Sequence, residues 1–317
     1  MRILIVGAGG RHRTEQSLLR AARSLGHTSR LLDAPWHRRG GPAGLRLAAW
    51  RLARFEPDFV LCTRHAMALG DATLRPALRH RRSAFWYFDA VSPLPEPVRL
   101  LASLTGTTFA TYGFQVNAFR ALGVKSHFLP QGADPATDHP VPRAPAAWHC
   151  EISFVGSGQY PRREQLLRSV TARYRVQIRG PRWDAATPDL PVAGGAVRAD
   201  GFRTAVRGAL VSLGINALAS QSAERLGGTS NRLWRVLACG GCFLGEHVGG
   251  IERFATPGEH ALWYRSTEEA IALAGRVLAE PELRSRLAES GRRHVLAHHT
   301  YAHRMPLLLA GQGYTST

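Results

Sequence analysis

Residues 236–254 read VLACGGCFLGEHVGGIERF, two apolar runs separated by Cys-Gly-Gly-Cys and followed by a second glycine pair. The C-x-x-C spacing of Cys239 and Cys242 occurs in redox pairs and in half of a zinc site. This pair, however, follows the helical pattern of residues 232–238, and the dipole at a helix C-terminus opposes a thiolate. Zinc also needs two further ligands, and the sequence has no second C-x-x-C pair. We therefore interpret both cysteines as small buried residues and the glycines as the informative feature.

The glycines mark turns at the two ends of a predicted strand. Gly240 and Gly241 end the helix and let the chain enter the strand CFLGE. Gly249 and Gly250 follow that strand, at the carboxyl edge where open α/β sheets bind ligands. Backbone N–H groups at the start of a following helix would suit a phosphate, whereas a tight turn is the alternative interpretation.

Composition limits the class of protein. The 317 residues are 44% hydrophobic, enough for two domains of ordinary size. No apolar run has the length of a membrane helix and the first residues carry no cleavage signal, so we expect a cytoplasmic protein. Four cysteines are too few for a disulfide framework, which agrees with a reducing compartment.

Charge raises the question of an anionic partner. Forty-one basic residues against 23 acidic ones give a formal charge of +18. Such an excess is typical of proteins that contact an acidic polymer, a nucleic acid or, peripherally, a lipid surface. The alternative is a basic surface that is simply solvated.

Strand and helix patterns alternate along the chain. RILIVGAGG is an apolar run that breaks on glycines, and a helical pattern up to Gly26 follows it. Residues 134–148 contain four prolines and no periodicity, which predicts a linker, and the strand–glycine–helix pattern then restarts. This alternation predicts two Rossmann-like α/β domains with parallel sheets, at residues 1–140 and 141–317, facing across a cleft. The last helix either stays with the second domain or packs back on the first.

The stretch SNRLWRVLACGGCFLGEHVGGIERF, with TPGEHALWYRSTEEAI and HHTYAHR after it, resembles the CgeB-like glycosyltransferases, relatives of the GT-B enzymes. ISFVGSGQYPRREQLL and LPQGADP also resemble this family, so the similarity extends over residues 85–304. It implies a GT-B fold, a nucleotide-sugar donor held by the C-terminal domain, an acceptor held by the N-terminal domain, and no metal. The absence of a D-x-D sequence agrees with the last point.

The donor site is expected around the glycine loops of the second domain. Arg232, beside Asn231 at the start of a helix, is placed to bind the diphosphate, unless it only faces solvent. Arg235 stands where many relatives have a ribose-binding Glu, which leaves the donor nucleotide open. The loop GSGQYPRRE offers a second anion site before a helix. The donor-binding candidates are Gly156, Ser157, Arg163, Asn231, Arg232, Arg235, Gly249 and Gly250.

The first glycine loop, GAGGRH, is the rival motif. Gly7, Gly9 and Asp33 partly match the dinucleotide fingerprint, but His12 occupies the third glycine position, where bulk disfavours close packing. In the glycosyltransferase interpretation this loop faces the cleft. The general-base candidates are then His12 and Asp89, since both follow predicted strands. The other acceptor-side candidates are Gly9, Gly10, Gln131 and Asp134.

We therefore predict a nucleotide-sugar-dependent glycosyltransferase that uses neither metal nor cofactor and transfers a sugar to an acceptor hydroxyl. The charge favours an acidic polymer or a modified nucleic-acid base as acceptor. An NAD(P)-dependent oxidoreductase and a non-catalytic nucleic-acid-binding module are the alternatives. The sugar, the acceptor and the stereochemical outcome are left open by the sequence.

Overall fold

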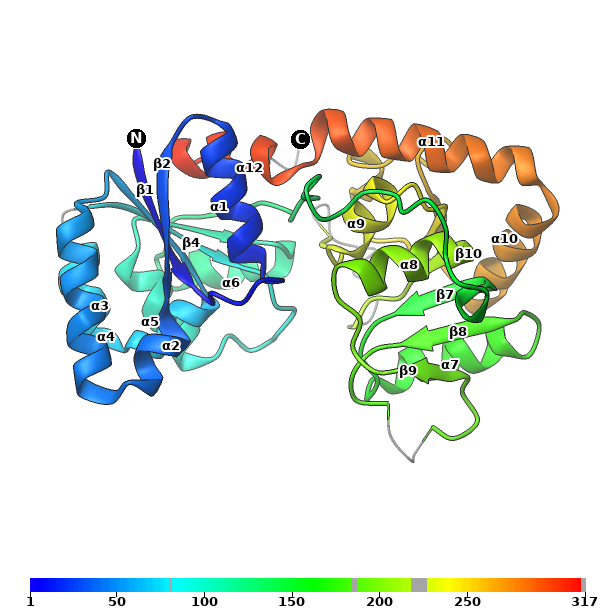
Figure 1. Ribbon diagram of the computed structural model, residues 1–317, viewed down its shortest axis with the longest axis horizontal. Coiled ribbons are helices and arrows are strands. Elements are labelled where there is room, and N and C mark those ends of the chain that lie inside the picture. The colour runs from blue at the N-terminus through cyan, green and yellow to red at the C-terminus, as the bar shows by residue number, and fades with distance from the viewer. Residues whose placement is uncertain (80, 184–186, 218–226, 315–317) are drawn as a thin grey trace. The chain divides into compact units, whose positions relative to one another are not determined.

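The computed structural model describes residues 1–79, 81–183, 187–217 and 227–314 (Figure 1). The chain forms two compact units. Unit 1 comprises Met1–Gln131 and Tyr301–Thr317, and unit 2 comprises Gly132–Thr300.

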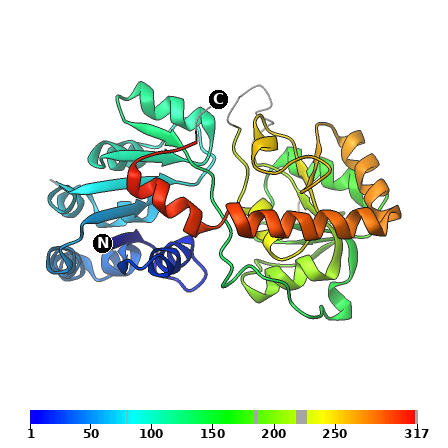
Figure 2. The ribbon, with the colours of Figure 1, turned by 90° about the horizontal axis from the view of Figure 1, so that it is seen from above.

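The first unit ends earlier than the predicted boundary at residue 140, because the segment after Gln131 bonds to unit 2. The Ala133 N–H donates to the His299 carbonyl at 2.9 Å, and Asp138 forms an ion pair with Arg235. The last helix, α12 (Tyr301–Ala310), belongs to unit 1, where it packs beside α1 (Thr14–Ser24; Figure 2).

Unit 1 is built on a six-stranded parallel sheet whose strand order is β2-β1-β3-β4-β5-β6. Its strands are β1 (Arg2–Gly7), β2 (Thr28–Asp33), β3 (Phe59–Thr63), β4 (Arg82–Tyr87), β5 (Thr107–Ala110) and β6 (Ser126–Phe128). Its other helices are α2 (Ala34–Arg39), α3 (Gly41–Phe55), η1 (Arg64–Leu69), α4 (Asp71–Leu78), α5 (Glu96–Leu104) and α6 (Gly113–Ala121). β3 is buried on both faces, which explains why it reads as a continuous apolar run.

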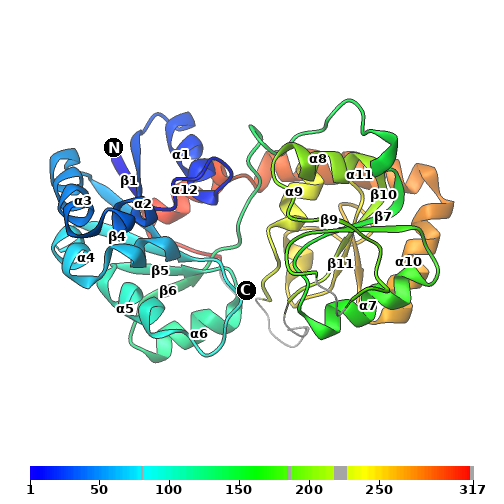
Figure 3. The same ribbon diagram turned by 60° about the horizontal axis from the view of Figure 1, so that its bottom comes forward.

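Unit 2 repeats this architecture with the order β12-β11-β10-β7-β8-β9, again parallel (Figure 3). Its strands are β7 (Cys150–Val155), β8 (Val176–Arg179), β9 (Val192–Gly194), β10 (Ala209–Gly214), β11 (Phe243–Glu246) and β12 (Leu262–Tyr264). Its helices are η2 (Ala146–Trp148), α7 (Pro161–Thr171), α8 (Asp200–Gly208), α9 (Arg232–Ala238), η3 (Ile251–Arg253), α10 (Thr267–Ala279) and α11 (Pro281–His298). The prediction of two Rossmann-like units with parallel sheets is confirmed.

Each sheet has a point where the strand order reverses. In unit 1 the chain moves from β1 outward to β2 and then returns to the other side of β1 with β3. In unit 2 the same reversal lies between β7 and β10. Because ligands of open α/β sheets bind at the carboxyl ends of the strands beside such a reversal, these two places define where to look for a site.

Candidate active site

The reversal point of unit 2 is held together by Arg163, from the first turn of α7. This side chain is only 5% exposed. Its Nη1 atom donates to the Ser157 carbonyl at 2.6 Å, and its Nη2 atom donates to the Ile215 carbonyl at 3.0 Å. Arg163 therefore ties the glycine loop after β7 to the segment that follows β10.

Arg232, the first residue of α9, reaches the same place. Its Nε atom donates to the Val155 carbonyl at 2.7 Å, and its Nη1 atom donates to the Ile215 carbonyl at 3.4 Å. The guanidinium carbons of Arg163 and Arg232 lie 5.2 and 4.8 Å from the centre of the Phe154 ring. The structure thus brings together two predicted donor-binding residues, and it concentrates positive charge at the carboxyl edge of the sheet.

Gly156 leaves the space that Arg232 occupies. A Cβ atom at Gly156 would lie 2.6 Å from Nη2 of Arg232 and 2.7 Å from Cζ of Phe154. Any side chain at this position would therefore displace the guanidinium or the ring. The glycine is required by close packing against a cation.

A carboxylate that the sequence reasoning missed lies at the end of β11. Glu246 is buried, accepts a hydrogen bond from the Asn216 N–H at 3.1 Å, and forms an ion pair with Arg162 of α7. The hydrogen bond to Glu246 is the main reason that the pKa of Arg162 is raised. The sequence signal was an acidic residue ending the apolar strand FLGE.

The reversal point of unit 1 also holds a buried carboxylate, from Glu15 in α1. Its Oε1 atom accepts hydrogen bonds from the Ala8 N–H at 3.1 Å, the Thr63 hydroxyl at 2.6 Å and Nδ1 of His65 at 2.9 Å. Burial by itself raises the pKa of Glu15, but the bonds from His65, Thr63 and Ala8 outweigh burial and lower it. Glu15 is therefore ionised at neutral pH.

His65, in η1, is the exposed partner of this pair. Its side chain is 24% exposed, whereas that of Glu15 is 2% exposed. Because the carboxylate accepts from Nδ1, the other ring nitrogen, Nε2, is the one that can accept a proton. A histidine oriented by a buried carboxylate is the arrangement used for general-base catalysis. The sequence reasoning missed both residues.

Comparison with known proteins identifies the fold. The family model described as Glycosyl transferase-like matches residues 162–310, a little under half of the chain. Sucrose-phosphate synthase from Thermosynechococcus elongatus is 14% identical over 98% of both chains, with a TM-score of 0.66. The chain has a GT-B fold. HepE from Anabaena, solved with UDP and glucose, is 11% identical over 96% of this chain and 98% of its own, with a TM-score of 0.67.

A third solved structure is similar over most of its length. BGT of phage T4, solved with its substrate UDP-glucose, is 12% identical over 94% of this chain and 95% of its own, with a TM-score of 0.60. No curated protein matches the sequence significantly. The GT-B fold that the resemblance implied is thus confirmed, and the CgeB-like assignment stays a prediction.

Arg235 contacts different partners from Arg232 within this GT-B fold. Its Nε atom donates to Oδ1 of Asp138 at 2.8 Å, and its guanidinium carbon lies 3.9 Å from the centre of the Phe202 ring. Asp138 is buried, so Arg235 neutralises it and fixes the linker segment to α9. A role for Arg235 in donor binding stays a prediction.

The remaining unit-2 candidates lie in tight turns. Gly250 has a φ of 75°, and the Gly227 N–H donates to the Gly249 carbonyl at 2.7 Å. The helix expected to follow is the single turn η3. Asn231 precedes α9 without a side-chain cap bond. These observations favour the tight-turn interpretation of Gly249 and Gly250.

The two residues predicted as general base differ in their surroundings. His12 is exposed in the GAGGRH loop. Asp89 forms an ion pair with Arg64, with 2.7 Å between Oδ2 and Nη1. The Asp89 carboxylate is thus already paired with a cation, so the geometry favours His65 over Asp89.

The predicted acceptor-side residues mostly contact other parts of the protein. A Cβ at Gly9 would lie 2.5 Å from Oδ2 of Asp33, whereas Gly10 is exposed. Gln131 is buried and donates to the Tyr301 hydroxyl at 3.4 Å. Asp134 is buried and accepts from the Ala136 N–H at 3.1 Å. Their role toward an acceptor stays a prediction.

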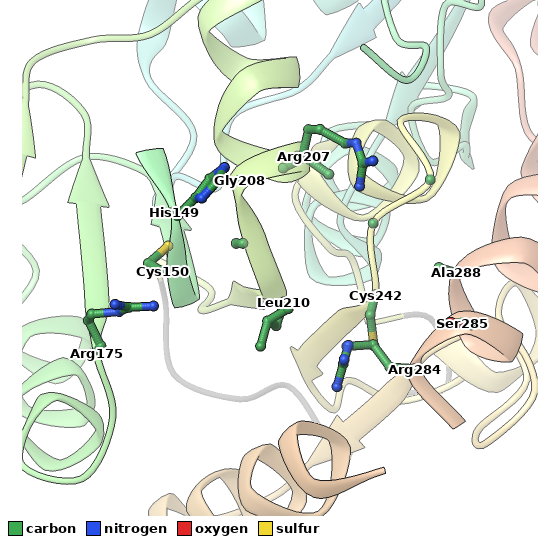
Figure 4. A pocket seen from close by; sticks show the side chains of 14 residues that line it. His149, Cys150, Arg175, Arg207, Gly208, Leu210, Cys242, Arg284, Ser285 and Ala288 are labelled. Atoms are coloured by element: carbon green, nitrogen blue, oxygen red, sulfur yellow. The ribbon is translucent and has the colours of Figure 1, made fainter. Parts of the chain in front are cut away.

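Cys239 and Cys242 lie away from the carboxyl edge of the unit-2 sheet, between the end of α9 and the start of β11. A pocket of about 520 Å³ opens at the amino ends of β7, β10 and β11, where Cys242 lies next to Arg284 (Figure 4). Burial raises the pKa of Cys239 and of Cys242 to about 12. The interpretation of both as buried, unreactive residues agrees with this geometry.

Two kinds of feature are absent from the part of the chain that the structure describes. There, no three His, Cys, Asp or Glu side chains group as metal ligands do. In the same residues, no helix has the length and apolar character that crossing a membrane requires.

Proposed function

We propose that this protein is a glycosyltransferase that moves a sugar from a nucleoside-diphosphate sugar to an acceptor hydroxyl. The observation that carries the proposal is the pair Arg163 and Arg232 at the reversal point of unit 2. The family match over residues 162–310 supports it. Because similar GT-B structures hold UDP or UDP-glucose, we propose a uridine nucleotide as the donor.

The arginine pair supplies what the departing diphosphate needs. Two guanidinium groups stacked on Phe154 and fixed to backbone carbonyls provide positive charge without reorganisation during the reaction. They also fix the loop after β7 through the Val155 and Ser157 carbonyls. The Gly156 and Gly158 N–H groups already donate to backbone carbonyls, so the guanidinium groups are the donors that we assign to the diphosphate. We propose on this basis that the reaction proceeds without a metal ion or other cofactor.

Unit 1 provides the proton acceptor in this proposal. As the sugar carbon forms its bond to the acceptor oxygen, the bond to the diphosphate breaks and the diphosphate leaves with the electron pair. The hydroxyl proton moves to Nε2 of His65, and Glu15 stabilises the resulting imidazolium. The pair of residues thus serves the acceptor, and the arginines serve the donor.

The proposed acceptor class rests on the charge of the chain, and the proposed location rests on its cysteines. The charge of +18 supports an acceptor that is an acidic polymer or a modified nucleic-acid base. All four cysteines are buried free thiols, which supports a cytoplasmic location. The oxidoreductase alternative would use Asp33 for a ribose, and Oδ1 of this carboxylate already accepts from the Trp36 N–H at 3.2 Å, so the contact would fall to the remaining acceptor sites.

A thermal-shift panel tests the donor. UDP, UDP-glucose, GDP, dTDP and CMP are compared with NAD(H) and NADP(H). A ligand present at about 100 times its Kd stabilises the folded protein by about 2.7 kcal/mol. We expect stabilisation by the uridine nucleotides, reduced in Arg232→Ala. Stabilisation by a nicotinamide cofactor alone would overturn the proposal.

A further inference from the structure

Residues 34–55, a continuous segment of unit 1, carry positive charges and no negative ones. The segment contains five arginines and neither aspartate nor glutamate, and it forms α2 and α3. The nearby acidic residues have partners of their own. Asp33 accepts from the Trp36 N–H, Glu56 pairs with Arg2, and Asp71 pairs with Arg75. The five arginines outnumber these three carboxylates, so the segment and its surroundings stay net positive.

Two tryptophans of this surface are exposed to solvent. Trp36 is 49% exposed and Trp50 is 59% exposed. The guanidinium carbon of Arg51 lies 5.7 Å from the Trp36 ring centre, and that of Arg54 lies 6.0 Å from the Trp50 ring centre. Exposed tryptophan beside arginine is the composition of protein segments that lie in the interface of a membrane.

An apolar groove of about 280 Å³ lies between α3 and α4, which lie side by side (Figure 3). Its apolar walls include Leu45, Ala49, Ala53, Ala72, Pro76 and Ala77. Arg46 and Arg81 also line it. The groove thus combines an apolar interior with two cations.

Helical spacing explains this arrangement on α3. Leu45, Ala49 and Ala53 are four residues apart and form one stripe on the groove side. Arg46, Trp50 and Arg54 form the adjacent stripe, and all three are exposed. The buried stripe, which contains Ala48, Leu52 and Phe55, faces away from Trp50, and Leu52 also lines the groove. The exposed side is therefore amphipathic in its own right.

We propose that this α2–α3–α4 surface binds the anionic face of a phospholipid membrane peripherally. The arginines contact lipid phosphates, the tryptophans lie at the level of the headgroups, and the groove accepts an acyl segment. The groove favours lipid over nucleic acid, because most of its lining is apolar and only Arg46, Thr73 and Arg81 carry hydrogen-bonding side chains. This inference does not depend on the proposed transfer reaction.

Vesicle co-sedimentation of the full chain tests the proposal. The protein is mixed with neutral phosphatidylcholine vesicles, or with vesicles containing about 30% phosphatidylglycerol, at about 150 mM salt. We expect binding to the anionic vesicles alone. Trp36→Ala with Trp50→Ala should reduce that binding about tenfold, and Ala49→Glu should reduce it because a carboxylate then lines the groove.

A matched control separates this surface from net charge. Arg46→Ser with Arg54→Ser removes two charges from the surface, and Arg286→Ser with Arg293→Ser removes two exposed charges from α11. We expect only the first pair to weaken vesicle binding, with unfolding temperatures unchanged in both. Equal losses in the two pairs, or full vesicle binding by the double tryptophan variant, would overturn the proposal. The proposal would also be overturned if the double tryptophan variant lost binding to single-stranded DNA but kept its binding to vesicles.

Discussion

The Nδ1 atom of His65 lies 2.9 Å from Oε1 of Glu15, although the two residues are 50 positions apart in the sequence. The parallel pairing of β1 and β3 produces this contact. Val6 is opposite Cys62 near the carboxyl ends of the two strands, so the residues that follow each strand meet. The carboxylate is buried and the imidazole is partly exposed, which suits a base that is oriented from within the protein.

Replacing His65 by alanine should therefore slow transfer without weakening donor binding. We expect kcat to fall about 100-fold, in the range lost with a general base. The Kd for UDP, measured by calorimetry, should stay unchanged, because the arginine pair belongs to unit 2. His12→Ala is the matched control and should keep near-normal kcat. If His12→Ala lowered kcat and His65→Ala did not, His12 would be the general base.

Gly156→Ala should weaken donor binding. The new methyl group would lie 2.6 Å from Nη2 of Arg232 and would push the guanidinium from its place. Gly195 offers a control, because a Cβ there meets no atom within 4 Å. We expect Gly195→Ala to bind UDP normally and Gly156→Ala to raise its Kd. An unchanged Kd in Gly156→Ala would show that the arginine position does not matter for the nucleotide.

The fold was predictable because its signals are local. Strands buried on both faces read as apolar runs, as in RILIVG, and glycines such as Gly26, with a φ of 80°, end helices where a left-handed residue is needed. The candidate residues Arg163 and Arg232 were predictable for the same reason. Both follow glycine-containing loops that lie beside the strand ends.

The parts that were missed depend on distant partners. Glu15 and His65 come into contact only through strand pairing, and no spacing in the sequence predicts this contact. The unit boundary depends on Asp138 and Arg235, which are 97 positions apart. A proline-rich segment has the pattern of a linker whichever unit it joins. The boundary predicted from the sequence therefore lies later in the chain than the boundary between the two units.

Acidification should destabilise unit 2 through His260. Burial lowers the pKa of His260 below its ordinary value of 6.5, and the neighbouring His294, stacked at 3.8 Å between ring centres, lowers it further. The unfolded chain therefore takes up a proton near pH 6.5, whereas the folded chain does so only at lower pH. Stability is full above about 6.5 and falls as pH drops toward the folded pKa. Urea unfolding of His260→Asn should show a weaker pH dependence in this window, and an unchanged one would contradict the assignment.

Replacing Cys239 and Cys242 together by serine should leave activity largely intact. Both thiols are buried with a pKa of about 12, so neither forms a reactive thiolate at neutral pH. A packing cost of about 1 kcal/mol for each substitution should appear in the unfolding temperature. Activity should also survive EDTA and dithiothreitol. Loss of activity with either reagent would show a metal or disulfide requirement.

Arg232 and Arg235 lie one helical turn apart in α9 and should differ in what their loss affects. Arg232 bonds to the Val155 and Ile215 carbonyls, whereas Arg235 bonds to the buried carboxylate of Asp138. Removing Arg235 leaves that carboxylate without its cation, so we expect the free energy of unfolding to fall. Donor affinity should change little.

Arg232→Ala should instead act mainly on the donor. A hydrogen bond from a cation to a charged group contributes about 1.5 to 3 kcal/mol, so its loss should lower kcat/KM at least about tenfold. Arg232→Lys should recover only part of this, because an ammonium cannot reproduce the guanidinium's separate bonds to two carbonyls. Steady-state kinetics with varied donor, beside unfolding temperatures for all three variants, separate the two roles. If Arg235→Ala lost donor affinity as strongly as Arg232→Ala, the diphosphate would have to contact the Asp138 side of α9, and the arginine pair around Phe154 would be structural.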